Sequence, residues 1–223
     1  MMSITKKVNF SDLLSEDVRI ELQRQLDSLL LSERQNINTD PSIQNSYQSI
    51  AHVLQSNEEL ATTSLIELFN TLFIDDHVQL IRGEREPEYH PATPLRPARI
   101  EFAYGFFASA LHEISHWCIA GPARRKLADF GYWYAADGRT LKQQRAFEQV
   151  EIRPQAIECL FTLACKRDFQ VSTDNIFATY DTSWSHFSMD VYKQAKSYLN
   201  RPESLPLDAQ RLLQALLKLE AIS

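Results

Sequence analysis

The chain has 223 residues, of which 44% are hydrophobic and 23% charged, and these are ordinary values for one globular domain. Its net charge of −6 disfavours general nucleic-acid binding and favours a cationic ligand or partner. No stretch approaches the ~20 apolar residues of a membrane-spanning helix, and the N-terminal segment lacks the apolar run of a secretory signal. The three cysteines form no CxxC pair. These features predict a cytoplasmic protein with neither a nucleic-acid nor a membrane partner.

The first half of the chain is predicted to hold three helices and two short strands. The first helix follows Ser15 and carries Val18, Leu22 and Leu26 on one face. A second helix is expected from Asp40-Pro41, and a polar connector at residues 55–59. A third helix at 63–73 precedes strands at 77–82 and 99–103, and the proline-rich residues 84–97 between the strands are expected to form an ordered loop without helix or central strand.

The second half is predicted to be almost entirely helical. A buried helix at 105–119 ends at Gly121-Pro122, and an aromatic, turn-rich segment follows at 129–139. A helical region is expected at 141–166, interrupted or entered at Pro154, and two further helices at 186–199 and 207–222. The fold class is therefore helix-rich α+β. We expect one compact metalloenzyme domain at 59–223, preceded by an N-terminal helical extension at 1–58 that packs on this domain or on another subunit.

The motif that carries chemistry is HEISH at residues 112–116, a match to HExxH. On a helix, positions i and i+4 lie on one face, so His112 and His116 can reach one metal ion, and Glu113 lies beside it. With this composition, chance predicts about 0.01 such matches in the chain. Two core histidines bonded to backbone would be the alternative explanation. The pattern therefore indicates a metal site.

The motif leaves the chemistry open. A zinc hydrolase, either a peptidase or a nuclease, would use Glu113 as the general base. A non-haem Fe(II) oxygenase would use two histidines and one carboxylate, with open positions on the metal. A non-catalytic domain with a structural metal would need four protein ligands. The extended motif HExxHxxGxxH is absent, so the third ligand must come from elsewhere, and the candidate carboxylates are Glu148, Glu151, Glu158, Asp129 and Asp137.

Residues 62–200 resemble the bacterial elongation factor P hydroxylase family. The segments HEISHWCIAG, DFGYWY, DGR and FEQVE followed by PQA carry this resemblance, in that order. The resemblance implies an enzyme that hydroxylates the β-lysylated lysine of elongation factor P at a non-haem metal centre, with Fe(II) as cofactor, zinc as the alternative and molecular oxygen as cosubstrate. It also implies a shape similar to that of a metal-dependent endoribonuclease. His112 and His116 would bind the metal, together with a carboxylate from the segment Glu148 to Glu151, and no 2-oxoglutarate motif is evident.

Among these carboxylates, Glu151 is predicted to be the third ligand and Glu148 is the alternative. Pro154 biases the preceding residue away from helix, so a boundary or kink is expected close to Glu151, and metal sites often draw a ligand from such a junction. Glu148 would then bind a substrate ammonium group or act through a ligand. In the hydroxylase, Glu113 would orient a histidine or relay a proton.

Several other residues have two possible interpretations. Arg124, Arg125 and Lys126 form either a docking patch or a solvated helix face. The aromatic residues near the motif either guide a cationic substrate or fill the core, and core packing is favoured. The cysteines are expected to be small buried apolar residues. The aromatic residues are Trp117, Tyr132, Trp133 and Tyr134, and the cysteines are Cys118, Cys159 and Cys165.

Overall fold

The structure, a computed structural model, describes residues 8–31, 57–131, 138–173 and 186–221. It is helix-rich α+β, as expected from the sequence. The α-helices are α1 (Glu16–Leu31), α3 (Glu58–Leu72), α4 (Phe107–Arg124), α5 (Leu141–Ala164), α6 (Phe187–Asn200) and α7 (Leu207–Ala221). The strands are β1 (Val78–Arg82), β2 (Glu88–His90) and β3 (Ala98–Phe102). Short 3-10 turns are η1 (Ser11–Leu14), η2 (Ile74–Asp76), η3 (Ala103–Gly105), η4 (Ala128–Gly131) and η5 (Pro202–Ser204).

The sheet has the strand order β1-β3-β2, so β3 is central. β1 pairs with β3 in parallel, from Val78 opposite Ala98 to Arg82 opposite Phe102. β2 pairs antiparallel to β3, with Tyr89 opposite Ile100. The buried residues of β1 and β3 form the face that packs on helices α3 and α4.

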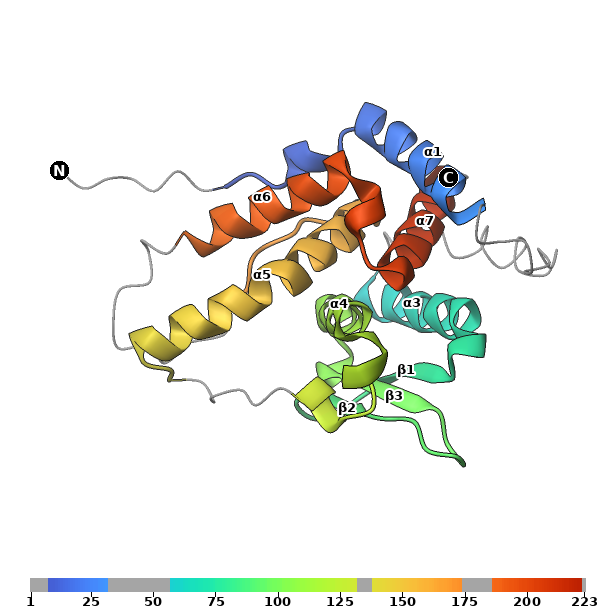
Figure 1. Ribbon diagram of the computed structural model, residues 1–223. Helices are drawn as coiled ribbons and strands as arrows, with labels where there is room; N and C mark the ends of the chain where they lie inside the picture. The colour runs from blue at the N-terminus through green and yellow to red at the C-terminus, as the bar shows by residue number, and fades with distance from the viewer. Residues whose placement is uncertain (1–7, 32–56, 132–137, 174–185, 222–223) are drawn as a thin grey trace.

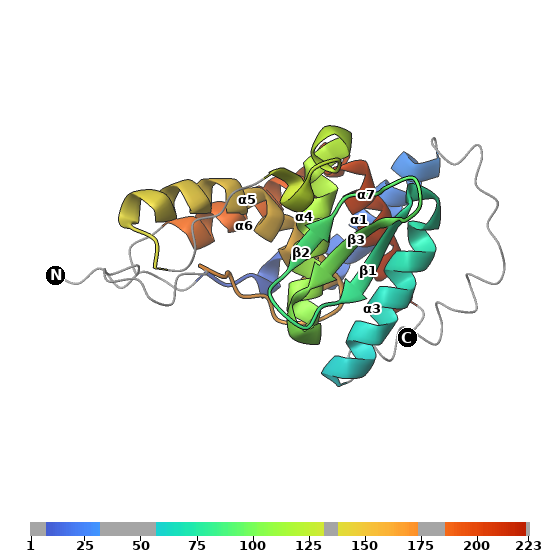
Figure 2. The same ribbon diagram turned by 90° about the horizontal axis from the view of Figure 1, so that it is seen from below.

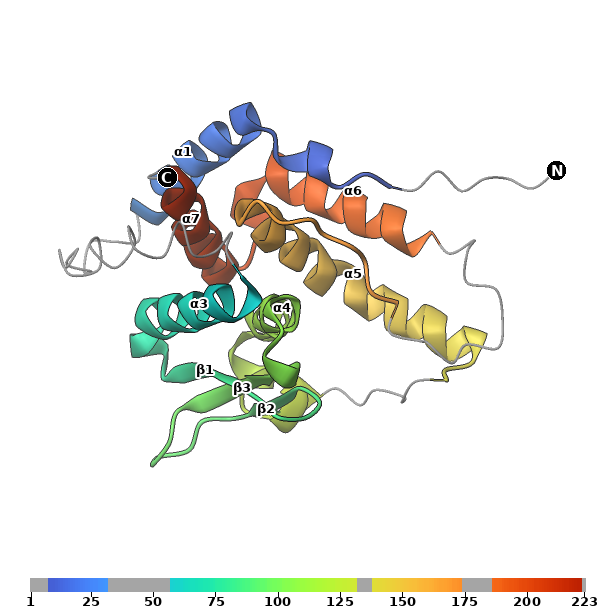
Figure 3. The same cartoon turned by 180° about the vertical axis from the view of Figure 1, so that it is seen from behind.

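The helices form layers above this sheet. α3 and α4 lie directly on it, and α1 and α7 lie beyond them (Figures 1 and 2). α5 and α6 pack side by side and extend away from the sheet, and the C-terminal half of α5 lies beside α4 (Figures 1 and 3). Trp117 of α4 packs edge-on against Phe69 of α3 and Phe73 at the C-cap of that helix, with ring centroids at 5.5 and 5.0 Å. α4 is therefore enclosed by the other elements and is held rigidly.

Contacts at both ends of α4 explain where it begins and ends. Tyr104 and Gly105 have φ of 50° and 78°, which turns the chain sharply from β3 into the helix. The backbone N–H of Phe107 is in the first turn of α4 and has no acceptor within the helix. It donates to the Glu58 carboxylate of α3 at 2.8 Å instead. At the other end, Gly121 has φ 68° and ψ 171°, so the regular helix stops there, as the sequence predicts.

Most predicted elements are confirmed, and three details are wrong. Glu58 and Glu59 belong to α3 rather than to a connector, because the Asn57 side chain accepts the N–H of Leu60 at 3.0 Å and caps the helix just before them. The loop at 84–97 contains β2, an edge strand between prolines. α5 runs through Pro154 without a break. The helix expected from Asp40-Pro41 lies outside the described residues.

The N-terminal segment packs on the domain. Leu22, Leu26 and Leu30 of α1 are buried, and α1 contacts α7. Arg19 donates to the carbonyl oxygens of Leu163 and Ala164 at the C-terminal end of α5, where the last carbonyls lack α-helical partners. The division at residue 58 remains a prediction, and η1 and α1 share one hydrophobic core with the rest of the chain.

The remaining side-chain interpretations have clear outcomes. Arg125 is a structural residue, because its guanidinium lies 3.6 Å from the Trp117 ring centroid and pairs with Asp208 at 2.6 Å. The idea of a docking patch through Arg125 is therefore wrong. All three cysteines are buried thiols, as expected. No helix in the described ranges has both the length and the apolar character that crossing a membrane requires.

Candidate metal centre

Helix α4 presents two histidines at the centre of the molecule. His112 and His116 are one turn apart, and their Nε2 atoms are 3.1 Å apart. The flanking residues Leu111, Ile114 and Ser115 are fully buried, which fixes the rotation of α4 about its axis. The His112 side chain is 26% exposed and that of His116 is 9% exposed, so solvent reaches the pair from the His112 side.

Helix α5 brings Glu151 to the same point. Its carboxylate oxygens lie 3.6 Å from Nε2 of His112 and 3.3 Å from Nε2 of His116, and the side chain is 1% exposed. These three residues are the one group in the described ranges whose ligand atoms all lie within 4.8 Å of one another. Two ligands of one ion at about 2.1 Å, 90–109° apart, would themselves be about 3.0–3.4 Å apart. The observed spacing therefore fits a single divalent metal ion.

Glu158 orients His112 from the other side of the imidazole ring. Its Oε2 lies 2.8 Å from Nδ1 of His112. Glu158 is seven residues after Glu151, about two helical turns, and therefore lies on the same face of α5. A proton on Nδ1 that is donated to this carboxylate leaves Nε2 with its lone pair directed at Glu151 and His116. Carboxylates hold metal-binding histidines in this way and increase their basicity. Glu158 was one of the candidate ligands, but its orienting role was missed in the sequence, because it depends on how α4 and α5 pack.

Three carboxylates concentrate negative potential on the histidines. Burial lowers the pKa of His112, but the hydrogen bond and charge of Glu158, with the charges of Glu151 and Glu113, outweigh it and raise the pKa to about 10. Burial opposes ionisation of Glu151, yet the two histidines bring its pKa down to about 2. Burial raises the pKa of Glu113 despite the histidines. A site that attracts a proton this strongly also suits a divalent cation.

Gln155 links the site to the chain beyond α5. Its Nε2 donates to the Ser172 carbonyl at 2.8 Å and lies 3.5 Å from Glu151 Oε2, and its Oε1 accepts the Ser172 N–H at 3.1 Å. The segment after α5 therefore folds back over Glu151 and excludes water from it. The near-total burial of Glu151 follows from this contact.

Asp129 and Glu148, two other candidate ligands, do not join this group. Asp129 accepts the Tyr89 N–H at 2.9 Å, which gives it a structural role. Asp137 is outside the described residues, as are Tyr132, Trp133 and Tyr134. Trp117 is core, as favoured from the sequence. Glu148 is half-buried and lies next to Gln144 rather than between the histidines. The junction expected near Glu151 is wrong, since α5 continues to Ala164.

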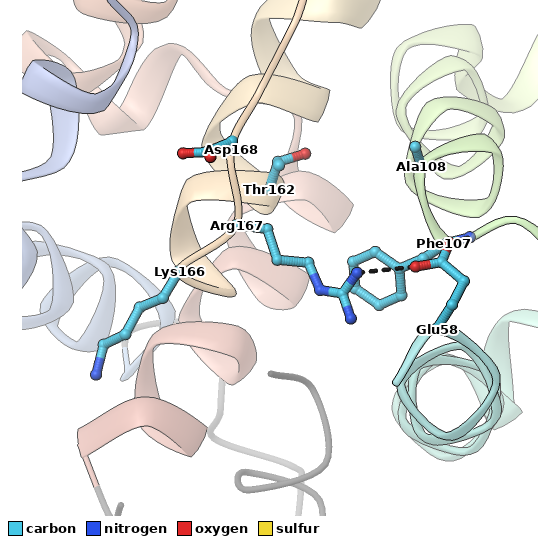
Figure 4. A pocket seen from close by; sticks show the side chains of 7 residues that line it. All are labelled: Glu58, Phe107, Ala108, Thr162, Lys166, Arg167 and Asp168. Atoms are coloured by element: carbon cyan, nitrogen blue, oxygen red, sulfur yellow. Dashed lines mark hydrogen bonds and ion pairs between the residues drawn. The ribbon is translucent and has the colours of Figure 1, made fainter. Parts of the chain in front are cut away.

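A pocket of about 420 Å³ lies next to the centre, between the start of α4 and the end of α5 (Figure 4). Ala108 and Thr162 line it, and they are one helical turn from His112 and Glu158 respectively. Arg167 reaches across to Glu58 at 3.0 Å and stacks on the Phe107 ring at 4.3 Å, as Figure 4 shows. This ion pair closes one side of the pocket.

Two histidines of a buried helix and a carboxylate of a neighbouring helix define a candidate metalloprotein of the two-histidine, one-carboxylate class. Comparison with known proteins gives a narrower assignment. The sequence model of the family described as elongation factor P hydroxylase matches residues 68–221. A Haemophilus influenzae protein named elongation factor P lysine hydroxylase is 43% identical over 154 residues, which cover 68% of this chain and 85% of that protein. The chain belongs to the elongation factor P hydroxylase family, and the expectation from its motifs is confirmed.

Proposed function

We propose that this protein is an enzyme that hydroxylates a lysine side chain of elongation factor P, in its β-lysylated form, at an Fe(II) centre. The supporting observation is that the Glu151 carboxylate faces the Nε2 atoms of both His112 and His116 in a chain of this family. The three side chains would occupy one face of the ion and leave open positions, as in non-haem iron oxygenases. The zinc-hydrolase alternative also uses HExxH, but the similarity to a protein named elongation factor P lysine hydroxylase supports the hydroxylase.

Hydroxylation replaces a C–H bond by C–OH. One oxygen atom of O₂ enters the product, and the other leaves as water with two electrons and two protons from an external reductant. Bound iron would supply the reactivity toward O₂ and the one-electron chemistry that protein side chains lack. The rest of the reaction depends on how the protein binds, orients and shields the reactants.

The protein's own residues have distinct tasks in this proposal. Glu158 fixes the ring of His112 through the Nδ1 hydrogen bond, so that Nε2 faces the ion. Gln155 and the segment at Ser172 keep water from Glu151. Glu113, whose pKa burial raises, can hold a proton beside the histidines and pass it on. The three buried thiols suit the reducing cytoplasm, where we propose that the enzyme acts.

Mass spectrometry of elongation factor P tests the function directly. Cells that lack this protein should lose the form that is about 16 Da heavier, the mass of the one oxygen atom that O₂ chemistry adds. The wild-type gene should restore it, and genes for His112→Ala or Glu151→Ala should not. If the heavier form persists in deleted cells, the proposal is wrong.

Iron content tests the ligand set separately. Protein purified without oxygen should contain iron, and Glu151→Ala should lose it while Glu148→Ala retains it. The opposite pattern would make Glu148 the third ligand. Stoichiometric zinc, with peptide hydrolysis that disappears in Glu113→Gln, would favour the hydrolase instead.

A further inference from the structure

One face of α5 carries polar side chains along most of the helix, and most of these side chains are buried. Its side chains follow the spacing 4-3-4-3-4, which places them within about 80° of one another around the helix. Burial of polar groups is costly unless each has a partner, so each member needs an explanation. Glu151 and Glu158 belong to the candidate metal centre, and Gln155 pairs with Ser172. The six residues are Gln144, Glu148, Glu151, Gln155, Glu158 and Thr162.

Gln144 is the member whose hydrogen bonding is incomplete. The residue is 2% exposed, and its Nε2 donates to the Thr173 carbonyl at 2.9 Å and to Glu148 Oε1 at 3.3 Å. These two acceptors fix the amide orientation, because the reverse orientation would set oxygen against oxygen. Oε1 of Gln144 is then a buried acceptor with no donor among the described residues. Such a group is costly to leave unpaired and indicates a missing donor.

We propose that Gln144 Oε1 and the Glu148 carboxylate bind a primary ammonium group of the substrate's side-chain arm. The inference rests on the proposed function and extends it to a substrate subsite. An ammonium group carries three N–H donors and a positive charge, which matches one neutral acceptor and one carboxylate. The Gln144 and Glu148 oxygens are at most about 5.5 Å apart, given the amide geometry, and one nitrogen can bridge that span with two ordinary hydrogen bonds.

The position of the subsite along α5 suits this role. Glu148 and Gln144 are three and seven residues before Glu151, a rise of about 4.5 and 10 Å along the helix axis. An extended lysine side chain reaches about 6 Å from Cα to Nζ. An arm with its terminal ammonium at this subsite would therefore place methylene carbons near the metal centre. The subsite would hold the charged end of the arm and align its carbon chain.

Direct binding of n-pentylamine, a primary ammonium probe, tests the subsite without turnover. Isothermal titration calorimetry on iron-loaded wild type should detect binding, and 1-pentanol, which has no charge, should bind at least tenfold more weakly. Glu148→Gln and Gln144→Met should each weaken pentylamine binding about ten- to a hundredfold, the range for a hydrogen bond to a charged group. Glu67→Gln on the exposed face of α3 is the matched control and should have no effect.

Kinetics on β-lysylated elongation factor P should show that the two residues affect substrate binding and not turnover. KM should rise about tenfold or more in Glu148→Gln and Gln144→Met, with kcat and iron content within about twofold of wild type. Wild-type pentylamine affinity in both variants would overturn the subsite. Loss of iron in Glu148→Gln would overturn it too, because Glu148 would then be a ligand. If wild type binds pentylamine through these residues and yet leaves elongation factor P unchanged, the subsite stands and the proposed function fails.

Discussion

Replacing Glu158 tests whether the centre depends on a residue that does not touch the metal. Glu158 is 8% exposed, and its carboxylate holds Nδ1 of His112 at 2.8 Å. Removal of such an orienting partner lowers metal affinity about 10- to 100-fold, or about 1.4–2.7 kcal/mol. Glu158→Ala should reach the upper part of this range, because the imidazole loses both the hydrogen bond and the charge. Glu158→Gln should lie at the lower end, since its amide oxygen still accepts the Nδ1 proton.

The assay is a competitive titration of iron against a chelator of known affinity, under anaerobic conditions, with circular dichroism as a check on the fold. Glu67→Gln again serves as the control, because it removes an equal charge far from the histidines. An unchanged iron affinity in Glu158→Ala would refute the orienting role. Complete loss of iron, equal to that of His112→Ala, would show instead that Glu158 is itself a ligand.

Three further predictions follow from the same structure. His112→Ala and His116→Ala should each abolish iron binding and hydroxylation while the circular dichroism spectrum stays that of wild type, and full activity in metal-stripped protein would contradict the metal role. Glu113→Gln should reduce hydroxylation mildly, because the amide keeps the size and position of this side chain beside the histidines, whereas a loss of several orders of magnitude would identify Glu113 as an essential base. Leu26→Ala, at a fully buried position of α1, should lower the free energy of unfolding by about 2–5 kcal/mol in a denaturant titration. Ile20→Ala on the same helix, at a side chain that is 63% exposed, should change it by about 0.5 kcal/mol or less; equal effects would show that α1 does not pack as described.

The local features of the fold were predictable from the sequence. Apolar periodicity located α6 and α7 to within a residue, a cap marked the start of α1, and Gly121 marked the end of the regular part of α4. Errors occurred where side-chain contacts override the local signal. Glu58 was placed in a connector although it belongs to α3. Proline at position 154 suggested a break, but α5 continues, because its C-terminal half is buried on several sides and this packing outweighs the missing hydrogen bond.

For the candidate site, too, some features were determined by the sequence and others only by the tertiary structure. HExxH determines that His112 and His116 share one face, since 3.6 residues per turn is a property of any helix. The sequence also named Glu148, Glu151 and Glu158 among the candidate carboxylates, and it placed Glu148 and Glu151 toward the same side of a second helix. Only the tertiary structure decided that Glu151 faces both Nε2 atoms and Glu158 lies against Nδ1, because that choice depends on the position and angle at which α5 crosses α4. The crossing is set by burial of side chains along the whole chain, which no local pattern encodes.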